Sequence, residues 1–395
     1  MSEWKEYRLG DIGKIVTGKT PKTAITDNYG GNIPFLSPSD NMELKYVPIT
    51  ARHLTEKGLA EVKSCLIPEN SVCVSCIGSN MGKSVITVRP IVTNQQINSI
   101  IPSSNFDTNF LYYILQNKKR EIKFLGRNGT AVPILNKSAF SNLTILAPEL
   151  DEQRSIASIL SSLDSKIENN RKICANLEAQ AQALFKHWFI DFAPFKDGKF
   201  VESELGMIPE GWRVGSPYEF LDFIYGAPYK SNLFNDKKEG LPLIRIRDLK
   251  DCSPQFYTPE VLPKSEYVKA GDILAGMDAE FAPYIWKGQQ GLLNQRVCKI
   301  KPKSKEIGRF FCMLLVKPQL LFVQAVKTGT TVSHIGKSDI DRFKVILPPL
   351  NEVIRFSKLG EEILDEIITV SAESSRLSSL RDTLLPKLMS GEIKV

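Results

Sequence analysis

Apolar residues recur in steps of four and three along one stretch that is almost free of glycine and proline, from Asp151 to Trp188. The positions with this spacing are Ile156, Leu160, Leu163, Ile167, Cys174, Leu177, Ala181, Leu184 and Trp188, with Asn170 as the one polar member. Steps of four and three are the heptad spacing of a helix that packs along another helix. The pattern therefore predicts a long paired helix over residues 151–191.

A second stretch near the C-terminus has the same spacing. Its apolar positions are Phe356, Ile363, Ile367, Val370, Leu377, Leu384 and Leu388, whereas Gly360, Ser374 and Arg381 stand at other places on the seam. We expect this second helix, over 351–391, to be weaker or to pack differently. If the two helices pack together, the order of the chain makes them antiparallel. A 38-residue helix would be about 57 Å long, so we expect a dumbbell with a helical rod.

The segments before the two long helices have a different pattern, in which glycine and proline punctuate short apolar runs. These runs, IPFLS, SVCVSCI and SVITV in one segment and LPLIRI and RVCKI in the other, are typical of strands. A helix is predicted at Thr108–Phe124 and again at Ile307–Ala325, with an interruption near Pro318. The mixture predicts an α+β fold class for both segments.

Aligning the sequence with itself shows that this order occurs twice. Trp4 pairs with Trp212 at an offset of 208, and after Asn94 the offset is 200. Over residues 94–152, 15 of 59 positions are identical, where unrelated sequences would share about four. The duplication predicts two tandem domains related by an approximate two-fold axis and separated by the antiparallel helices.

The predicted boundaries follow from these patterns. They are a first domain at 1–150, a first helix at 151–191, a linker at 192–211, a second domain at 212–350 and a second helix at 351–391.

Composition and charge indicate the protein class and the kind of partner. The chain has 395 residues, 42% hydrophobic and 24% charged, which is ordinary globular usage. Its net charge of +7 divides into +5 for 1–150, −2 for 151–208, +6 for 209–350 and −2 for 351–395. Two basic domains suggest a polyanionic partner, and a mild excess of surface lysine explains the charge equally well. The polar start and the seven scattered cysteines lead us to expect a cytoplasmic protein with reduced thiols.

Motifs for catalysis are weak. Gly13–Thr20 satisfies the phosphate-loop pattern, but Pro21 follows at once and leaves no room for the helix that such a loop requires. Cys73 and Cys76 form a lone CxxC pair, for which buried strand thiols are a better interpretation than a zinc site. We predict no catalytic residue, no metal and no cofactor.

Polar loops suited to nucleic acid occur in both copies. Asn and Gln side chains can bond bidentately to adenine and Arg to guanine, while cations beside small residues can contact phosphates. For loop residues that are alike in both copies, a structural role and a DNA contact are equally good interpretations. The divergent residues are therefore better candidates for reading bases. The candidates are Lys19, Thr20, Lys22, Ser37, Ser39, Asn41, Asn94, Gln95, Gln96, Arg127, Asn128, Thr130 and Lys137 in the first copy, and Tyr229, Lys230, Arg245, Arg247, Lys250, Asn294, Gln295, Arg296, Lys327, Thr330, His334 and Lys337 in the second.

The whole chain resembles the specificity subunit of type I restriction-modification systems. The resemblance rests on the opening WKEYRLGDIGKIVTGKTP, the Asn-Gln and Gly-Thr loops in both copies, the two spacer helices and the closing LLPKLMSGEI. It implies two target recognition domains that each read one half of a split sequence in double-stranded DNA. It also implies helices that set their separation and dock two methyltransferase (modification) subunits, with restriction or translocase subunits as further partners, and no catalytic site.

The helix positions that we expect to serve partner binding are the apolar seam residues. They are Leu160, Leu163, Ile167, Leu177, Leu184 and Trp188 in the first helix, and Ile363, Ile367, Leu377, Leu384 and Leu388 in the second. Two alternatives remain, a stand-alone DNA-binding regulator with the same architecture and a phosphate-loop nucleotidase.

Overall fold

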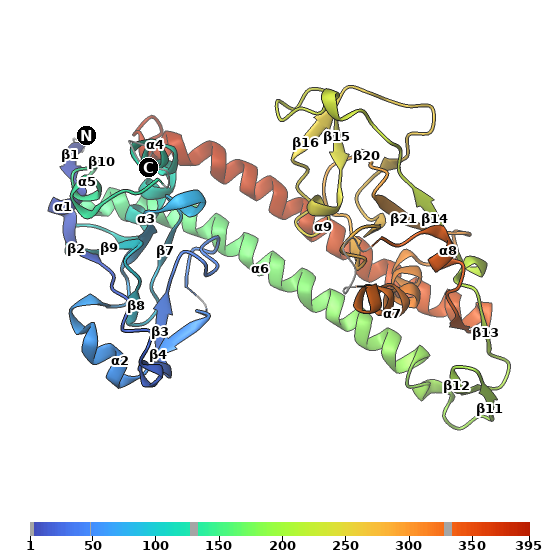
Figure 1. Cartoon of the computed structure of the whole chain (residues 1–395). Helices are drawn as coiled ribbons and strands as arrows, with labels where there is room; N and C mark the ends of the chain where they lie inside the picture. The colour runs from blue at the N-terminus through green and yellow to red at the C-terminus, as the bar shows by residue number, and fades with distance from the viewer. Residues whose placement is uncertain (1–3, 48, 127–132, 328–333) are drawn as a thin grey trace. The chain divides into compact units, whose positions relative to one another are not determined.

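Two compact units make up the chain (Figure 1). The structure, a computed structural model, describes residues 4–47, 49–126, 133–327 and 334–395. The first unit consists of Met1–Ile167 with Arg376–Val395, and the second is Glu168–Ser375. Each unit therefore holds one α+β domain and one part of each long helix.

The first unit is built on three small sheets. The larger two are ordered β2-β9-β6-β7 and β4-β3-β8-β5, and the third pairs β1 with β10. Only β3 and β8 run parallel among these pairs. The strands are β1 (Lys5–Arg8), β2 (Gly13–Thr17), β3 (Tyr29–Leu36), β4 (Arg52–Leu54), β5 (Leu66–Ile67), β6 (Val72–Ser75), β7 (Ser84–Ile86), β8 (Ile91–Thr93), β9 (Ile97–Pro102) and β10 (Thr144–Ala147). The helices are α1 (Leu9–Ile12), α2 (Glu56–Glu61), α3 (Thr108–Asn117), α4 (Lys119–Leu125) and α5 (Lys137–Ser141).

The second unit repeats this topology strand for strand. Its larger sheets are ordered β14-β21-β18-β19 and β16-β15-β20-β17, the third pairs β13 with β22, and β15 with β20 is again the parallel pair. The strands are β13 (Arg213–Gly215), β14 (Leu221–Tyr225), β15 (Leu241–Ile244), β16 (Phe256–Thr258), β17 (Tyr267–Val268), β18 (Ile273–Gly276), β19 (Pro283–Ile285), β20 (Gly291–Leu293), β21 (Val297–Pro302) and β22 (Val345–Leu347). The helices are α7 (Arg309–Lys327) and α8 (Lys337–Ile340). The predicted duplication is thus confirmed at the level of strand order.

One further hairpin has no counterpart among the described residues of the first unit. Strands β11 (Phe200–Ser203) and β12 (Gly206–Pro209) pair antiparallel within the segment that we predicted as a linker.

The core helices differ from the sequence prediction in two places. The helix expected at Thr108–Phe124 is divided at Lys118 into α3 and α4, and the interruption expected near Pro318 is wrong, because α7 continues through that proline. A proline removes only one backbone donor, and burial of the residues from Phe310 to Val316 stabilises the helix. By length and composition α7 could span a membrane, but this burial indicates a core helix.

The two long helices are α6 (Leu150–Phe189) and α9 (Leu350–Met389), each continuous in Figure 1. In the second unit they are antiparallel, since Asn170 Nδ2 donates to Glu373 Oε2 at 2.7 Å while Cys174, further along α6, contacts the carbonyl of Ile367. In the first unit Asp164 and Arg381 form an ion pair at 2.8 Å. The predicted helix pair is confirmed within each unit.

The polar seam positions of α9 have local explanations. Gly360 is buried, and a Cβ there would lie 3.4 Å from the Cβ of Phe310, so a small residue allows α9 to approach α7 closely. Ser374 donates to the carbonyl of Val370 at 3.0 Å. Arg381 pairs with Asp164. At these three positions α9 contacts α7, its own backbone and α6, so it packs differently from α6.

Candidate nucleic-acid interface

Three loops of the first unit meet at one end of its two larger sheets. The amide of Lys19 donates to the carbonyl of Thr93 at 2.9 Å, and the amide of Asn94 donates to the carbonyl of Leu36 at 3.0 Å. Thr20 Oγ1 also donates to Gln95 Oε1 at 2.6 Å. The loop after β2, the loop after β3 and the turn between β8 and β9 therefore form one surface, although they are widely separated in sequence.

The second unit joins its three equivalent loops by equivalent bonds. The amide of Ala227 donates to the carbonyl of Leu293 at 3.0 Å, and the amide of Asn294 donates to that of Ile244 at 3.1 Å. The amide of Gln295 in turn donates to the carbonyl of Ala227 at 3.1 Å. Each domain thus presents the same three-loop surface, which we call its reading face.

Gly18 and Gly226 make this close approach possible. A Cβ at Gly18 would lie 2.2 Å from the carbonyl oxygen of Thr93, and a Cβ at Gly226 would lie 2.2 Å from that of Asn294. Any larger residue would separate the loops. The glycine of the phosphate-loop pattern therefore has a structural task, and no helix begins at Lys19 or Thr20, where irregular backbone follows β2. The phosphate-loop alternative is wrong on this geometry.

The Asn-Gln turns are held by their asparagines. Asn94 Oδ1 accepts from the backbone amide of Gln96 at 3.1 Å, and Asn294 Oδ1 accepts from that of Arg296 at 3.1 Å. Only 8% and 7% of the two asparagines are exposed. A side-chain oxygen that bonds the amide two residues on stabilises a turn. For these two DNA-contact candidates, the geometry favours the structural interpretation that we gave equal weight: each asparagine shapes a turn, and the next residue, Gln95 or Gln295, is exposed.

An aspartate orders the loop after β3 and its counterpart after β15, half-buried at Asp40 and buried at Asp248. Asp40 Oδ2 accepts from the amide of Ser37 at 2.7 Å, and Asp248 Oδ2 accepts from that of Arg245 at 2.9 Å. Burial raises the pKa of Asp248, and the bonds from backbone amides oppose that shift. The Arg245 guanidinium lies 4.9 Å from the centre of the Phe256 ring, which orients it.

A fourth segment joins each reading face. The amide of Leu135 donates to the carbonyl of Cys76, and the amide of Cys76 donates to the carbonyl of Gln96. In the second unit the amide of Ile335 donates to the carbonyl of Met277, and the amide of Met277 donates to the carbonyl of Arg296. In the second unit His334 Nδ1 and Arg296 both contact the carboxylate of Asp278, at 2.6 and 3.1 Å. Lys337 and, in the first unit, Lys137 stand at the starts of the short helices that follow.

Lys327 is held in the same region. Its ammonium donates to Asp339 at 2.8 Å, and this bond lowers the pKa of the Asp339 carboxyl. Arg127, Asn128, Thr130 and Thr330, the candidates in the Gly-Thr loops, lie outside the described residues.

The candidate residues divide by exposure. Ser37, Asn94, Tyr229 and Asn294 are buried, and the Ser37 and Tyr229 hydroxyls bond to neighbouring side chains. Half-buried candidates are Thr20, Gln96, Arg245 and Lys327. The exposed ones are Lys19, Lys22, Ser39, Asn41, Gln95, Lys137, Lys230, Arg247, Lys250, Gln295, Arg296, His334 and Lys337. These last residues present the most surface to a duplex, and the half-buried ones present less.

The structure gives the cysteine pair no metal-binding geometry. Burial raises the pKa of Cys73 to about 12 and that of Cys76 to about 11, which keeps both as neutral thiols. Within the described residues, no group of three His, Cys, Asp or Glu side chains is placed to hold a metal ion.

The apolar seam of the long helices faces inward. Leu160 and Leu388 belong to the core of the first unit, and Trp188 and Ile367 belong to that of the second. The remaining positions that we expected to serve partner binding are half-buried, namely Leu163, Ile167, Leu177, Leu184, Ile363, Leu377 and Leu384. The four buried side chains hold this chain together, so a partner subunit would have to use other positions on the helices.

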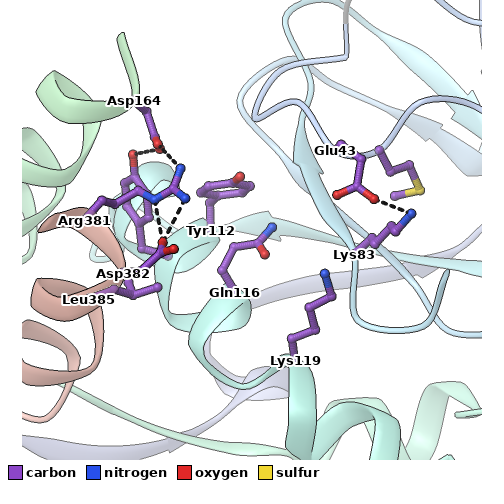
Figure 2. Close-up of a pocket in the computed structure, with 11 residues that line it drawn as sticks. Glu43, Lys83, Tyr112, Gln116, Lys119, Asp164, Arg381, Asp382 and Leu385 are labelled. Atoms are coloured by element: carbon purple, nitrogen blue, oxygen red, sulfur yellow. Dashed lines mark hydrogen bonds and ion pairs between the residues drawn. The ribbon is translucent and has the colours of Figure 1, made fainter. Parts of the chain in front are cut away.

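Sequence reasoning missed one polar network in the first unit. Arg381 lies between Asp164 and Asp382 at the edge of a cavity of about 300 Å³, which Tyr112, Gln116 and Lys119 also line (Figure 2). On the other side of the cavity Lys83 pairs with Glu43 at 2.6 Å. The pairs Asp164–Arg381 and Glu43–Lys83 join residues far apart in sequence. The local signal was an arginine on an apolar seam.

Known proteins match the chain over its full length. The family model described as type I restriction modification DNA specificity domain matches residues 1–179 and 209–377. The MjaIX specificity subunit of Methanocaldococcus jannaschii is 30% identical over 100% of this chain and 94% of its own length, and the HindI specificity subunit of Haemophilus influenzae is 23% identical over 100% of both. The crystal structure of an S subunit from M. genitalium covers 98% of this chain and 96% of its own with a TM-score of 0.57 at 15% identity, which supports the fold.

Proposed function

The chain belongs to the type I restriction modification DNA specificity family, and from this premise we propose that it reads a bipartite, asymmetric target in double-stranded DNA. The family model matches one segment in each half of the chain, and relatives of full length are specificity subunits of restriction enzymes. The chain is a non-catalytic specificity subunit. In the proposal each unit reads one half of the target, and the bases between the halves are not read.

One observation carries the proposal: the same reading face occurs twice with different side chains on it. Ser39 corresponds to Arg247, and both are exposed. Gln96 corresponds to Arg296 on turns of the same shape. An amide suits adenine and a guanidinium suits guanine. Equal backbones with unequal side chains support two half-sites that are not palindromic.

Charge supports contact with the DNA backbone. Residues 1–150 carry +5 and residues 209–350 carry +6, and several exposed candidates on each reading face are lysines. Lysines neutralise phosphates without regard to sequence, so they position the duplex while other side chains read it.

For the partners, we propose two methyltransferase subunits that dock on outward positions of α6 and α9, with restriction subunits joining the same complex in the cytoplasm. Ile173 on α6 and Leu359 and Leu380 on α9 are 37%, 42% and 47% exposed, which gives apolar anchors outside the buried seam. Copurification of the chain with a methyltransferase subunit would support this role, whereas a chain that bound its DNA target but no such subunit would fit the stand-alone regulator.

Selection from a randomised duplex library tests the DNA proposal. The purified full-length chain should enrich two short, different sequences at a fixed spacing. Arg247→Ala should relax preference in one of these halves and leave the other unchanged, because that side chain belongs to the second reading face alone. Enrichment of one continuous or palindromic sequence would contradict the proposal.

A further inference from the structure

Hydroxyl groups and aromatic rings surround the ammonium of Lys45 in the first unit. This ammonium donates to Tyr113 Oη at 3.1 Å and to Ser161 Oγ of α6 at 2.8 Å, and it lies 4.5 Å from the centre of the Tyr113 ring. The Tyr112 and Tyr46 rings are 5.6 and 5.4 Å away. A half-buried lysine with two hydroxyl acceptors and three aromatic rings has a fixed position.

The site continues into both long helices. Tyr113 Oη donates to Asp164 Oδ2 of α6 at 2.6 Å, and Asp164 Oδ1 accepts from Arg381 of α9 at 2.8 Å. Asp164 and Arg381 line the cavity in Figure 2. A chain of hydrogen bonds therefore runs from Lys45 through α3 to α6 and α9.

Lys45 also lies within the loop that joins β3 to β4. This loop starts with Ser37 and carries the exposed candidates Ser39 and Asn41, and its return is fixed where the amide of Ile86 donates to the carbonyl of Lys45 at 2.7 Å. Between these points Met42 is 3% exposed. The amide of Glu43 donates to Asn41 Oδ1 at 3.0 Å, so a buried side chain and a local hydrogen bond connect the anchored lysine to the candidates for base reading.

The second unit has no such network at the equivalent positions. Met313 replaces Tyr113, Leu364 replaces Asp164 and Ala181 replaces Arg381. Its corresponding ion pair to α6 joins Lys287, after β19, to Glu178 at 3.1 Å. In the second unit the link from the loop after β15 to α6 is indirect, since the amide of Lys287 donates to Cys252 Sγ of that loop at 3.2 Å.

We propose that Lys45, held by Tyr113, Ser161 and Asp164, is a positioning residue that determines specificity for the half-site read by the first unit. It fixes the loop Ser37–Asn41 against the helices, and loss of this tie lets the loop accept more than one base. The inference rests on the proposed function and adds a residue that need not touch DNA.

The experiment compares four full-length variants with the wild type by selection from the randomised duplex library. Lys45→Met removes the ammonium and keeps the length of the side chain, and Tyr113→Phe removes only the hydroxyl. Lys45→Arg is the conservative variant, and Lys63→Met is the matched control, an exposed lysine of the same domain. The half-site that Arg247→Ala leaves unchanged is assigned to the first unit.

Lys45→Met and Tyr113→Phe should reduce discrimination between the best and the next base about fivefold or more in the first unit's half-site. The other half-site and the spacing should stay as in the wild type, Lys45→Arg should regain part of the discrimination, and Lys63→Met should change nothing. A merely structural lysine would lower affinity for all sequences alike, so unchanged preference, or equal relaxation in both halves, would overturn the inference. If the wild type selects no bipartite sequence, the proposed function fails and the inference fails with it.

Discussion

The two units join the same domain to the same helices with different residues, although each junction combines apolar packing with ion pairs. In the second unit the junction is aromatic, with Phe185, Phe311 and Phe356 within 6.1 Å of one another, measured between ring centres. In the first unit the corresponding residues, Leu385, Leu111 and Ile156, are aliphatic. Elsewhere on the same helices, Asp164 and Arg381 form an ion pair where Leu364 and Ala181 stand in the second unit. Apolar packing stabilises without fixing one geometry, whereas hydrogen bonds between charged groups are directional and cost desolvation. The comparison shows that one topology accepts either an apolar contact or an ion pair at corresponding positions of the long helices.

The largest expected effect comes from opening the aromatic junction. Phe356 is completely buried, and Phe356→Ala should lower the free energy of unfolding of the second unit by about 3–5 kcal/mol. Native-state hydrogen exchange of the full chain, read separately for each unit, measures this. Leu359→Ala, one turn away and 42% exposed, is the control and should change stability by less than about 0.5 kcal/mol. A loss for Phe356→Ala no larger than that of the control would show that the aromatic cluster does not hold the junction.

The free energy of unfolding of the first unit should depend on whether one or both members of the Asp164–Arg381 pair are replaced. Arg381→Ala leaves Asp164 half-buried without its cation and should lower the free energy of unfolding of the first unit by about 1–3 kcal/mol. Asp164→Leu combined with Arg381→Ala copies the second unit, where Leu364 and Ala181 stand, and should recover most of that loss. The same exchange measurement applies. If the double variant is less stable than the single one by the sum of two independent losses, the equivalence of the two junctions is wrong.

A smaller effect should appear in the pH dependence of the first unit. Burial lowers the pKa of Lys45 to about 8, against the opposing pull of Asp164 and Asp107. Between about pH 8 and 10.5 the unfolded chain therefore binds the proton that the folded chain has lost, and stability should rise with pH by about 1 kcal/mol, allowing for the remaining exposure. Tyr113 stays protonated there because burial raises its pKa.

Lys45→Met isolates this contribution. The difference in free energy of unfolding between wild type and variant should change in favour of the wild type as pH rises through that window, measured by urea unfolding at fixed ionic strength. The Lys63→Met control should show no such trend, and a parallel pH profile for Lys45→Met would place the ammonium in contact with water.

Periodic features of the fold could be predicted from the sequence, because heptads and duplication are properties of the chain alone. The predicted helix pair and the repeated domain both follow from such patterns. The break at Lys118 and the continuity through Pro318 could not, since tertiary packing decided each against local propensity.

The candidate site likewise has features that the sequence predicts and features that it does not. The loops could be found because they recur, and the turn made by Asn94 is local enough to have been expected from its side chain. The network of Lys45 could not be found, because Ser161 and Arg381 come from elements more than 100 residues away. Burial of the seam also decided which helix positions remain for a partner.

The smallest expected effect concerns the reading faces, where the two units differ by single cations. Lys19 is exposed on the first face, and its counterpart on the second is Ala227. Lys19→Ala should weaken binding to all sequences alike and reduce the slope of log affinity against log salt by about 0.9, the share of one phosphate contact. Lys14→Ala removes an exposed lysine from the middle of β2, away from the reading face, and should leave the slope unchanged. Titrations at several salt concentrations with a fixed duplex measure both. Equal slopes for the two variants would mean that Lys19 does not contact the backbone of DNA, and that the first face gains no electrostatic advantage over the second at this loop.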